Sequence, residues 1–226
     1  MYKILKYKWE ERNKLFFSSD WHVFHDPQRW PVPIWKMEGY ESLDEKTEDV
    51  KNKVNAKVLE NDTLFFCGDG FLNATDEQCL EFLSGLNCQN IHYLFGNHSS
   101  NMYRLYKQEV QKQFGRDDIE VYPLLMGDVL FVGNHLEIRV GKQHIVMNHF
   151  PLRIWNKNNW RHGSPSWNLS GHSHGSDPQR LPEYPVGKGL DLGWSIKKDV
   201  WSFEEIADIM STKTVETVDH HDNTTT

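Results

Sequence analysis

The chain has 226 residues, of which 38% are hydrophobic and 25% charged, an ordinary composition for a globular protein with a sizeable core. Its formal net charge of −7 disfavours a dedicated nucleic-acid binder, because such proteins are usually basic. No apolar stretch is long enough to span a bilayer, and the basic N-terminus lacks the apolar segment of a secretory signal. We therefore expect a cytoplasmic protein without a membrane partner.

The three cysteines are odd in number and show no C-x-x-C pairing. This usage is typical of a reducing compartment and argues against a disulfide framework. Cys67, Cys79 and Cys88 are expected to be small buried apolar residues.

The first half of the chain alternates predicted strands and helices. Short β-rich apolar runs predict buried strands at 14–19, 63–67 and 91–95. Apolar periodicity predicts helices at 43–60, 75–86 and 101–114. A capping box of Thr75 and Gln78 opens the second helix, and Gly115 ends the third. The proline-rich and aromatic segment 21–40 is expected to be an ordered loop.

The second half of the chain changes to short strands with tight connections, predicted at 129–132, 136–140 and 143–147. Gly141-Lys142 suits a hairpin turn between the last two strands. Ser202 and Glu205 cap a final helix at 203–210, and the polar residues 211–226 are expected to form a loose tail. With no repeat or linker, residues 1–210 are predicted to form a single layered α/β domain.

Metal-ligating side chains follow five of the apolar runs, at the point where each run ends. In open α/β sheets, ligands bind beyond the carboxyl ends of the strands, so we expect these side chains to meet at one site. The runs end in Asp20-Trp21-His22, Gly68-Asp69, Gly96-Asn97-His98, Asn148-His149 and Gly171-His172-Ser173-His174.

Carboxylate, imidazole and amide groups suit Mn best, with Fe, Zn, Ni or Mg as alternatives. The candidate ligands include no cysteine, which argues against a structural zinc knuckle. Asp20 and His22 alternate along an extended segment, so both side chains can point to the same side. The two histidines of the last motif are spaced in the same way. With three further ligands, the set exceeds what one ion needs. It favours two metal ions about 3.5–4 Å apart, bridged by a carboxylate.

The ordered motifs resemble those of the calcineurin-like metallophosphoesterases, which show D-x-H, G-D, G-N-H, an isolated H and G-H-x-H in this order. The resemblance covers residues 14–210. The short chain and the position of His25 are similar to those of stand-alone bacterial and phage members of the family. It implies an α/β/β/α sandwich of four layers, with two mixed β-sheets face to face. It also implies a hydrolase of phosphomonoesters or phosphodiesters, nucleotides included, in which a hydroxide held by two metals attacks phosphorus.

The resemblance also implies a role for each motif residue. One metal would be held by Asp20, His22, Asp69 and His174, and the other by Asp69, Asn97, His149 and His172. Asp69 would therefore bridge the two ions. His98 would face the phosphate and protonate the leaving oxygen or stabilise the transition state.

One position departs from the pattern, because the family commonly has an acidic residue after G-N-H and this chain has Ser99. A hydroxyl could accept a hydrogen bond from His98, but it would not stabilise an imidazolium as a carboxylate does. We expect a proton donor of lower pKa, or a weaker dependence of the rate on His98.

A second G-N-H triplet, Gly133-Asn134-His135, lies between two predicted strands. A turn is the better interpretation, because Gly and Asn favour turns and the first triplet has the right place in the order.

Substrate contacts are predicted at His25 and in the segment 153–167, which lies between two of the motifs and is expected to rim the site. This segment interleaves tryptophans with cations, including Arg153 and Arg161, and such residues can stack a base and contact a phosphate. The alternatives are that the tryptophans pack the segment onto the core and that His25 is a loop residue.

Three functions compete. The first is a phosphatase or phosphodiesterase of small molecules. The second is a nuclease acting on DNA or RNA ends, which would need a basic groove that only residues 153–161 offer. The third is a metal-binding scaffold without catalysis, since the retromer scaffolding subunit, which resembles this fold, serves mainly in interactions.

Overall fold

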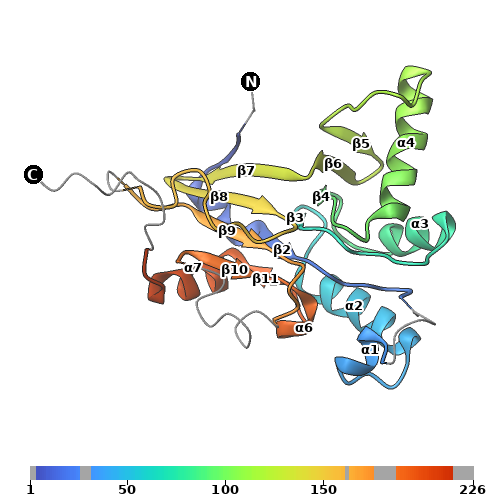
Figure 1. The fold of residues 1–226 in the computed structure, drawn as a ribbon, viewed down its shortest axis with the longest axis horizontal. Coiled ribbons are helices and arrows are strands. Elements are labelled where there is room, and N and C mark those ends of the chain that lie inside the picture. Colours follow the sequence, from blue (N-terminus) through green and yellow to red (C-terminus); the bar gives the residue numbers. More distant parts are fainter. Residues whose placement is uncertain (1–3, 26–31, 161–162, 176–186, 216–226) are drawn as a thin grey trace, which may run out of the picture.

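The computed structural model describes residues 4–25, 32–160, 163–175 and 187–215, which form an α/β structure with two mixed β-sheets (Figure 1). The five-stranded sheet has the order β1-β7-β8-β9-β10 and comprises Leu5–Tyr7 (β1), His135–Val140 (β7), Gln143–Asn148 (β8), Trp167–Ser170 (β9) and Gly189–Asp191 (β10). The six-stranded sheet has the order β11-β2-β3-β4-β6-β5 and comprises Leu15–Ser18 (β2), Thr63–Phe66 (β3), Ile91–Leu94 (β4), Leu124–Met126 (β5), Val129–Gly133 (β6) and Trp201–Ser202 (β11).

The strands that precede the motifs are parallel neighbours. In the six-stranded sheet β2, β3 and β4 run in parallel, with Phe17 paired to Phe65 and Phe65 to His92. In the other sheet β8 and β9 are parallel, with Met147 paired to Leu169. Each set of carboxyl ends therefore lies at one edge of its sheet, which is what the motif positions require.

Four helices begin and end close to the predicted residues: Leu43–Lys57 (α2), Asp76–Ser84 (α3), Ser100–Phe114 (α4) and Phe203–Thr212 (α7). Three short helices were not predicted: Ile34–Met37 (α1), Trp194–Lys197 (α6) and a 3-10 helix at Trp9–Lys14 (η1). The capping boxes at Thr75 and Ser202 are confirmed, because each hydroxyl accepts from the backbone N–H three residues on. Gly115 ends α4 in the left-handed conformation, with φ of 71°.

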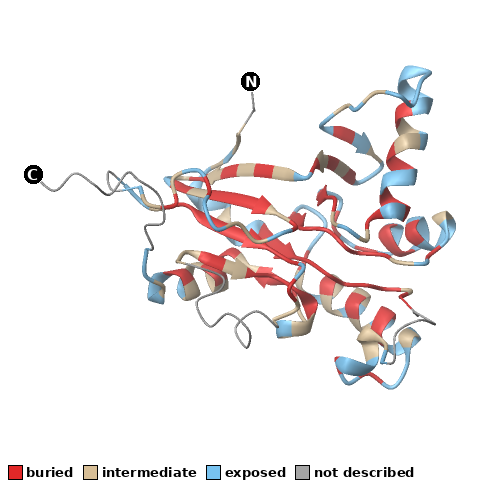
Figure 2. Ribbon diagram, in the orientation of Figure 1, coloured by how far each residue is buried: buried red, intermediate tan, exposed pale blue. Residues whose placement is uncertain are grey.

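Alternating side chains of the central strands build two cores. Phe16 and Phe66 point to the outer face of the six-stranded sheet, where α2, α3 and α4 pack on them. Phe17 and Phe65 point inward, where they meet side chains of the five-stranded sheet such as Ile138. The strands are accordingly the most continuously buried part of the molecule (Figure 2). Both faces of the six-stranded sheet are thus fixed, which holds the strand ends rigidly.

The outer face of the five-stranded sheet is covered differently. Val146 of β8 packs against buried Trp155 and partly buried Leu152, which belong to an irregular segment. Helix α7 packs its apolar face into the core between the sheets, through Phe203 and Ile206.

Several connections differ from the sequence-based expectation. Strands β6 and β7 are consecutive in the chain yet lie in different sheets, so Gly133-Asn134-His135, predicted as a turn, crosses between the sheets. The segment 21–40 is not wholly a loop, because α1 follows Pro33; residues 26–31 lie outside the described part. Helix α7 extends to Thr212, into the predicted tail, of which residues 216–226 are not described.

Other expectations hold. The hairpin between β7 and β8 is confirmed, with Gly141 at φ of 57°. The three cysteines are free and buried. Within the described ranges, the helices are too short or too polar for any of them to cross a membrane.

Candidate metal centre

The seven predicted ligands come together where the two sheets meet. Backbone hydrogen bonds align the first two motifs, from Asp20 N to Gly68 O at 3.0 Å and from His22 N to Asp69 O at 3.1 Å. In the other sheet, Gly171 N donates to His149 O at 2.9 Å. Each motif thus continues the pairing of the strand before it, and this pairing brings the ligating side chains into one cluster.

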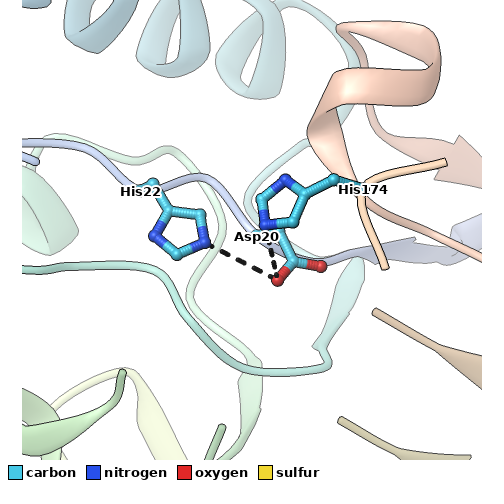
Figure 3. A group of neighbouring side chains, drawn as sticks. All are labelled: Asp20, His22 and His174. Carbon is cyan, nitrogen blue, oxygen red and sulfur yellow. Dashed lines mark ion pairs between the residues drawn. The ribbon is translucent and has the colours of Figure 1, made fainter. Parts of the chain in front are cut away.

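One group centres on Asp20, whose Oδ1 lies 3.8 Å from Nε2 of both His22 and His174 (Figure 3). These separations are too long for hydrogen bonds but within the span of about 4.2 Å that two ligands of one ion can reach. The other carboxylate oxygen, Oδ2, accepts from His172 N at 2.9 Å. Asp20 is therefore anchored through one oxygen and presents the other to two imidazoles.

Two members of this group are buried and have polar atoms without partners. The side chains of Asp20 and His22 are 0% and 1% exposed. Within the described part of the chain, Asp20 Oδ1 and both ring nitrogens of His22 have no hydrogen-bond partner. Buried polar atoms without partners are costly, and a bound cation would satisfy them.

A second group centres on Asp69 and repeats the arrangement. Asp69 Oδ1 accepts from His98 N at 2.8 Å, while Oδ2 lies 3.1 Å from His149 Nε2. Asn97 Oδ1 lies 2.8 Å from the same nitrogen and 3.0 Å from His172 Nδ1. The second aspartate is also anchored through one oxygen and presents the other to an imidazole.

Counting the hydrogen-bond donors and acceptors shows that this second group lacks a donor. Nδ1 of His149 lies 2.8 Å from the carbonyl oxygen of Cys67, which can only accept, so Nδ1 carries the proton. In the neutral imidazole, Nε2 is then a third acceptor beside the oxygens of Asp69 and Asn97. Three converging acceptors require a proton or a metal ion between them. The residues present therefore fit a metal ion of the kind that nitrogen and oxygen ligands prefer.

The two groups overlap. The ligating atoms of Asp20, Asp69 and His149 all lie within 4.8 Å of one another, as do those of Asp20, His22 and His174. Asp20 thus belongs to both sets, while the resemblance assigned the bridging position to Asp69. The structure therefore contains two groups of Asp and His residues, most of them buried, that could bind a metal ion.

The aspartates and imidazoles of the site shift each other's pKa. Burial by itself raises the pKa of Asp20, but the imidazoles of His22 and His174 outweigh burial and lower it to about 2. Burial lowers the pKa of His149, yet Asp69 and Asp20 outweigh this effect and the pKa is raised. The carboxylates and this imidazole therefore stabilise each other's charged forms.

The ligands are held in an unusual backbone conformation. Five have positive φ: Asp20 at 56°, His22 at 46°, Asp69 at 60°, His172 at 72° and His174 at 50°. Left-handed backbone is uncommon outside glycine, costs about 1–3 kcal/mol where it is strained, and concentrates at functional sites. Backbone hydrogen bonds between neighbouring motifs, such as His22 N to Asp69 O, hold the ligands in this geometry.

Two motif glycines are required by close approach. A Cβ on Gly96 would clash with Oδ1 and Cγ of Asp69, and a Cβ on Gly171 would clash with Ser19 Oγ and Asp20 Oδ2. Neither glycine has a positive φ, so the constraint is steric.

His98 is partly exposed beside the cluster, with its ring 5.7 Å from that of His22 and 6.3 Å from that of His25. The predicted hydrogen bond to Ser99 is not present, because the lone pairs of Ser99 Oγ accept from Gly96 N at 2.8 Å and Asp69 N at 3.3 Å. Ser99 thus supports the ligand loop and leaves His98 without an orienting partner there.

The predicted substrate residues fall in different places. His25 lies beside the cluster and is 5% exposed; burial and the charges of His22 and His98 lower its pKa to about 4. Arg153 is exposed on the surface, and Arg161 lies outside the described residues. The structure brings His25 close to the predicted ligands and gives no contact of Arg153 with them.

The described part of the segment 153–167 does not rim the site as expected. Lys157 Nζ lies 3.2 Å from His144 Nε2, five residues before His149 on β8, or about 16 Å along the strand. Trp155 and Trp167 are buried and pack onto the core, while Trp160 is 42% exposed. The segment crosses the outer face of the sheet because Trp155 anchors it there.

Two residues near the site were missed from the sequence. Asp191 is 4% exposed and orders the last motif, accepting from Gly175 N at 3.0 Å, from Gly193 N at 2.8 Å and from the Ser173 hydroxyl. Its strand β10 is only Gly189–Asp191, so no apolar run in the sequence pointed to it. Phe150 is 50% exposed with its ring 4.6 Å from that of His172, and only its position after His149 could have indicated it.

Comparisons with known proteins identify the fold and nothing finer. No protein-family model matches the chain, and no curated protein matches it. Among solved structures, the chain is similar to "The Crystal Structure of the Protein of Unknown Function AQ665 from Aquifex aeolicus", with a TM-score of 0.57 and 15% identity over 86% of this chain and 98% of that chain. This likeness concerns the α/β fold.

Proposed function

We propose that the protein is a metal-dependent phosphoesterase that uses a dinuclear centre to hydrolyse a phosphomonoester or phosphodiester of a small molecule, nucleotides included. The observation that carries the proposal is the repeated arrangement of Asp20 and Asp69. Each holds a backbone N–H through one carboxylate oxygen and presents the other to imidazole nitrogens. Two such groups that share atoms within 4.8 Å suit a pair of ions.

The residues divide into a buried floor and an exposed rim. Asp20, Asp69, His22 and His149 are buried, whereas Asn97 and His172 are exposed. We assign these six residues and His174 as the ligands of two divalent ions, with Mn²⁺ as the best fit to nitrogen and oxygen donors. Bound there, the ions would supply Lewis-acid chemistry, polarising the phosphoryl group and lowering the pKa of water.

His98 is assigned as the proton donor to the leaving oxygen. Its backbone N–H is fixed by Asp69, and its partly exposed ring lies beside the ligands. An imidazole can give up a proton near neutral pH, which is the requirement for a general acid here.

The four-layer α/β/β/α sandwich belongs to the same proposal. Helices α2, α3 and α4 supply one outer layer and the two facing sheets supply the next two. Among the described residues, the segment around Trp155 covers the outer face of the five-stranded sheet.

The test is a paired assay of the chelated and metal-loaded protein on p-nitrophenyl phosphate and bis-p-nitrophenyl phosphate. Activity is expected only after loading, with Mn²⁺ ahead of Zn²⁺, Ni²⁺ and Mg²⁺, and it should be lost in Asp69→Asn. Asp62→Asn is the matched control, because Asp62 is a buried aspartate at the other end of β3 that accepts from Leu59 N at 2.8 Å.

The outcomes separate the competing functions. Bound metal without hydrolysis of either ester would identify a scaffold and overturn the proposal. Preference for an oligonucleotide, with affinity that falls steeply as salt rises, would identify a nuclease. Activity that survives both chelation and Asp69→Asn would exclude a metal-dependent reaction at this site.

A further inference from the structure

We propose that Ser195 and Glu38 are positioning residues for His174, fixing which ring nitrogen of this histidine faces the metal centre; the proposal rests on the metal site of the proposed function. Nδ1 of His174 lies 3.0 Å from Ser195 Oγ. Ser195 Oγ in turn donates to Glu38 Oε1 at 2.6 Å. The chain of contacts joins the last motif to α6 and to the residue that ends α1.

The direction of the hydrogen bonds follows from counting hydrogens. A carboxylate can only accept, so the single hydroxyl hydrogen of Ser195 is used by Glu38. Ser195 can then only accept from His174, and the proton of the neutral imidazole must sit on Nδ1. This leaves the lone pair of Nε2 free on the side of Asp20, whose Oδ1 is 3.8 Å away.

The other oxygen of Glu38 pairs with a buried lysine. Lys46 Nζ lies 2.6 Å from Glu38 Oε2, and the two side chains are 0% and 3% exposed. This ion pair fixes the carboxyl group of Glu38 beside Ser195. Lys46 lies on α2, so a helix of the outer layer is connected to the metal centre through Glu38 and Ser195.

His174 needs such support more than the other imidazoles of its group. Its side chain is 28% exposed, whereas that of His22 is 1% exposed and confined by packing. His149 in the second group shows the same solution, because its Nδ1 is fixed by the carbonyl of Cys67. Outer hydrogen bonds of this kind orient metal-binding histidines, and their loss typically weakens metal affinity about 10–100-fold.

The first test replaces Ser195 by Ala and reads the tautomer of His174 in the metal-free protein from long-range ¹H–¹⁵N spectra, with the signal identified by its loss in His174→Gln. The wild type should show the Nδ1–H form, and Ser195→Ala should move toward Nε2–H. In calorimetric titration with Mn²⁺, Ser195→Ala should bind one ion about 10–100-fold more weakly.

Tyr40→Phe is the matched control. The Tyr40 hydroxyl is also buried between the region after α1 and α6, accepting from Trp194 Nε1 at 3.0 Å, but it has no contact with His174. It should leave the tautomer and the Mn²⁺ affinity unchanged at a similar cost in stability. An equal loss of affinity in both variants, or an unchanged tautomer in Ser195→Ala, would overturn the proposal.

The second test combines Glu38→Leu with Lys46→Met, so that removal of Glu38 does not leave the buried Lys46 without a counter-ion. Replacing a buried ion pair by apolar residues of similar volume is often tolerated. The Ser195 hydroxyl would then be free to donate to His174 Nδ1, which should favour the Nε2–H tautomer. Persistence of the Nδ1–H form would refute the role of Glu38.

These readouts need no substrate, so the two proposals fail separately. If Ser195→Ala weakens Mn²⁺ binding and no phosphoester is hydrolysed, the proposed function fails and the positioning role stands. If esters are hydrolysed but Ser195→Ala binds Mn²⁺ like the wild type, only the positioning role fails. A wild-type protein that binds no Mn²⁺ overturns both.

Discussion

Asp69 and His149 face each other across the seam between the two sheets, with Oδ2 of Asp69 3.1 Å from Nε2 of His149. Asp69 follows β3 of the six-stranded sheet and His149 follows β8 of the five-stranded sheet. Neither sheet alone carries a complete set of ligands. The packing of the two sheets against each other is therefore a condition for the site.

Metal stoichiometry should depend on Asp69. In Asp69→Asn the bound Mn²⁺, measured by elemental analysis after gel filtration, should fall from two ions per chain to fewer than one, because a bridging ligand serves both. Asp62→Asn should retain two. If Asp69→Asn loses one ion and Asp20→Asn loses both, the bridging role belongs to Asp20, which the geometry also places in both groups.

Metal loading should raise the melting temperature. The buried Asp20 and Asp69 present their free carboxylate oxygens together with imidazoles in the folded state alone, so an ion should bind and stabilise only that state. At a free Mn²⁺ concentration of about 100 times Kd, the gain of about 2.7 kcal/mol corresponds to a rise of about 5–10 °C in a chain of this size. Scanning calorimetry with and without chelator checks this, and equal transitions would contradict it.

Gly96→Ala should disrupt the site by steric clash. The new methyl group would meet the anchored oxygen of Asp69, so the loop or the carboxylate must move. We expect Mn²⁺ affinity to fall by at least about 10-fold, the lower range for disturbed ligand orientation. Gly85→Ala is the control, since its Cβ would meet neighbours at an ordinary 3.4 Å. Unchanged binding in Gly96→Ala would show that the loop has room to adjust.

Replacement of His98 should depend on the leaving group. As a proton donor, His98 should contribute about 10²–10⁴-fold for an alkyl phosphate, whose leaving oxygen needs the proton. His98→Gln should cost much less on p-nitrophenyl phosphate, whose leaving group departs as a stable anion. Equal losses in kcat on both substrates would indicate that His98 binds the phosphate and does not protonate the leaving oxygen.

The acid sensitivity of folding should involve Glu205. Burial raises its pKa, but Lys197, the Ser202 backbone and Lys57 outweigh burial and lower it from 4.5 to about 2. The stabilisation is therefore present above about pH 4.5 and is lost as the pH falls toward 2. Because the side chain is 39% exposed, solvent screening limits the effect to about 1 kcal/mol.

Glu205→Gln isolates this charge, because glutamine still completes the capping box with Ser202. Urea denaturation should show it less stable than wild type at pH 7 and equal to wild type near pH 2. The control is Glu204→Gln. Glu204 lies in the same helical turn, but its ion pair is long, with Oε1 3.6 Å from Arg12 Nε. A constant difference across this pH range would contradict the prediction.

The long elements of the fold could be predicted from the sequence because each one satisfies local rules. Helix α3 has its capping box at Thr75, and β3 is a four-residue apolar run. Strands β1, β10 and β11 have two or three residues each, and they form by pairing, β1 and β11 with strands distant in the chain and β10 with the strand before it. Their own residues carry too little pattern to reveal them.

Connections between sheets could not be predicted for a related reason. Strands β6 and β7 are separated by Asn134 alone, and the Gly133-Asn134 pair suits a turn by its residue types. Packing of Ile138 in the core between the sheets places β7 in the other sheet. The second G-N-H triplet, predicted as a turn, serves as the crossover between the two sheets.

For the site, residue types and their order identified the cluster, but its supporting atoms stayed hidden. Ser99 was assigned to His98 because they are neighbours in sequence, whereas its hydroxyl is engaged by Gly96 and Asp69. Glu38 and Ser195 lie 157 residues apart and carry no shared motif. Long-range hydrogen bonds of this kind depend on the finished fold.

The backbone hydrogen bonds that align the ligand loops have a consequence for how fast ions enter and leave. Asp20 N donates to Gly68 O and His22 N to Asp69 O, so the neighbouring loops hold each other and have little room to move as an ion passes. Ions would pass the exposed side of the site, where Asn97 and His172 lie, and the buried acids would be the last groups reached. Exchange should therefore be limited by release from Asp20 and Asp69, with fast uptake and slow escape.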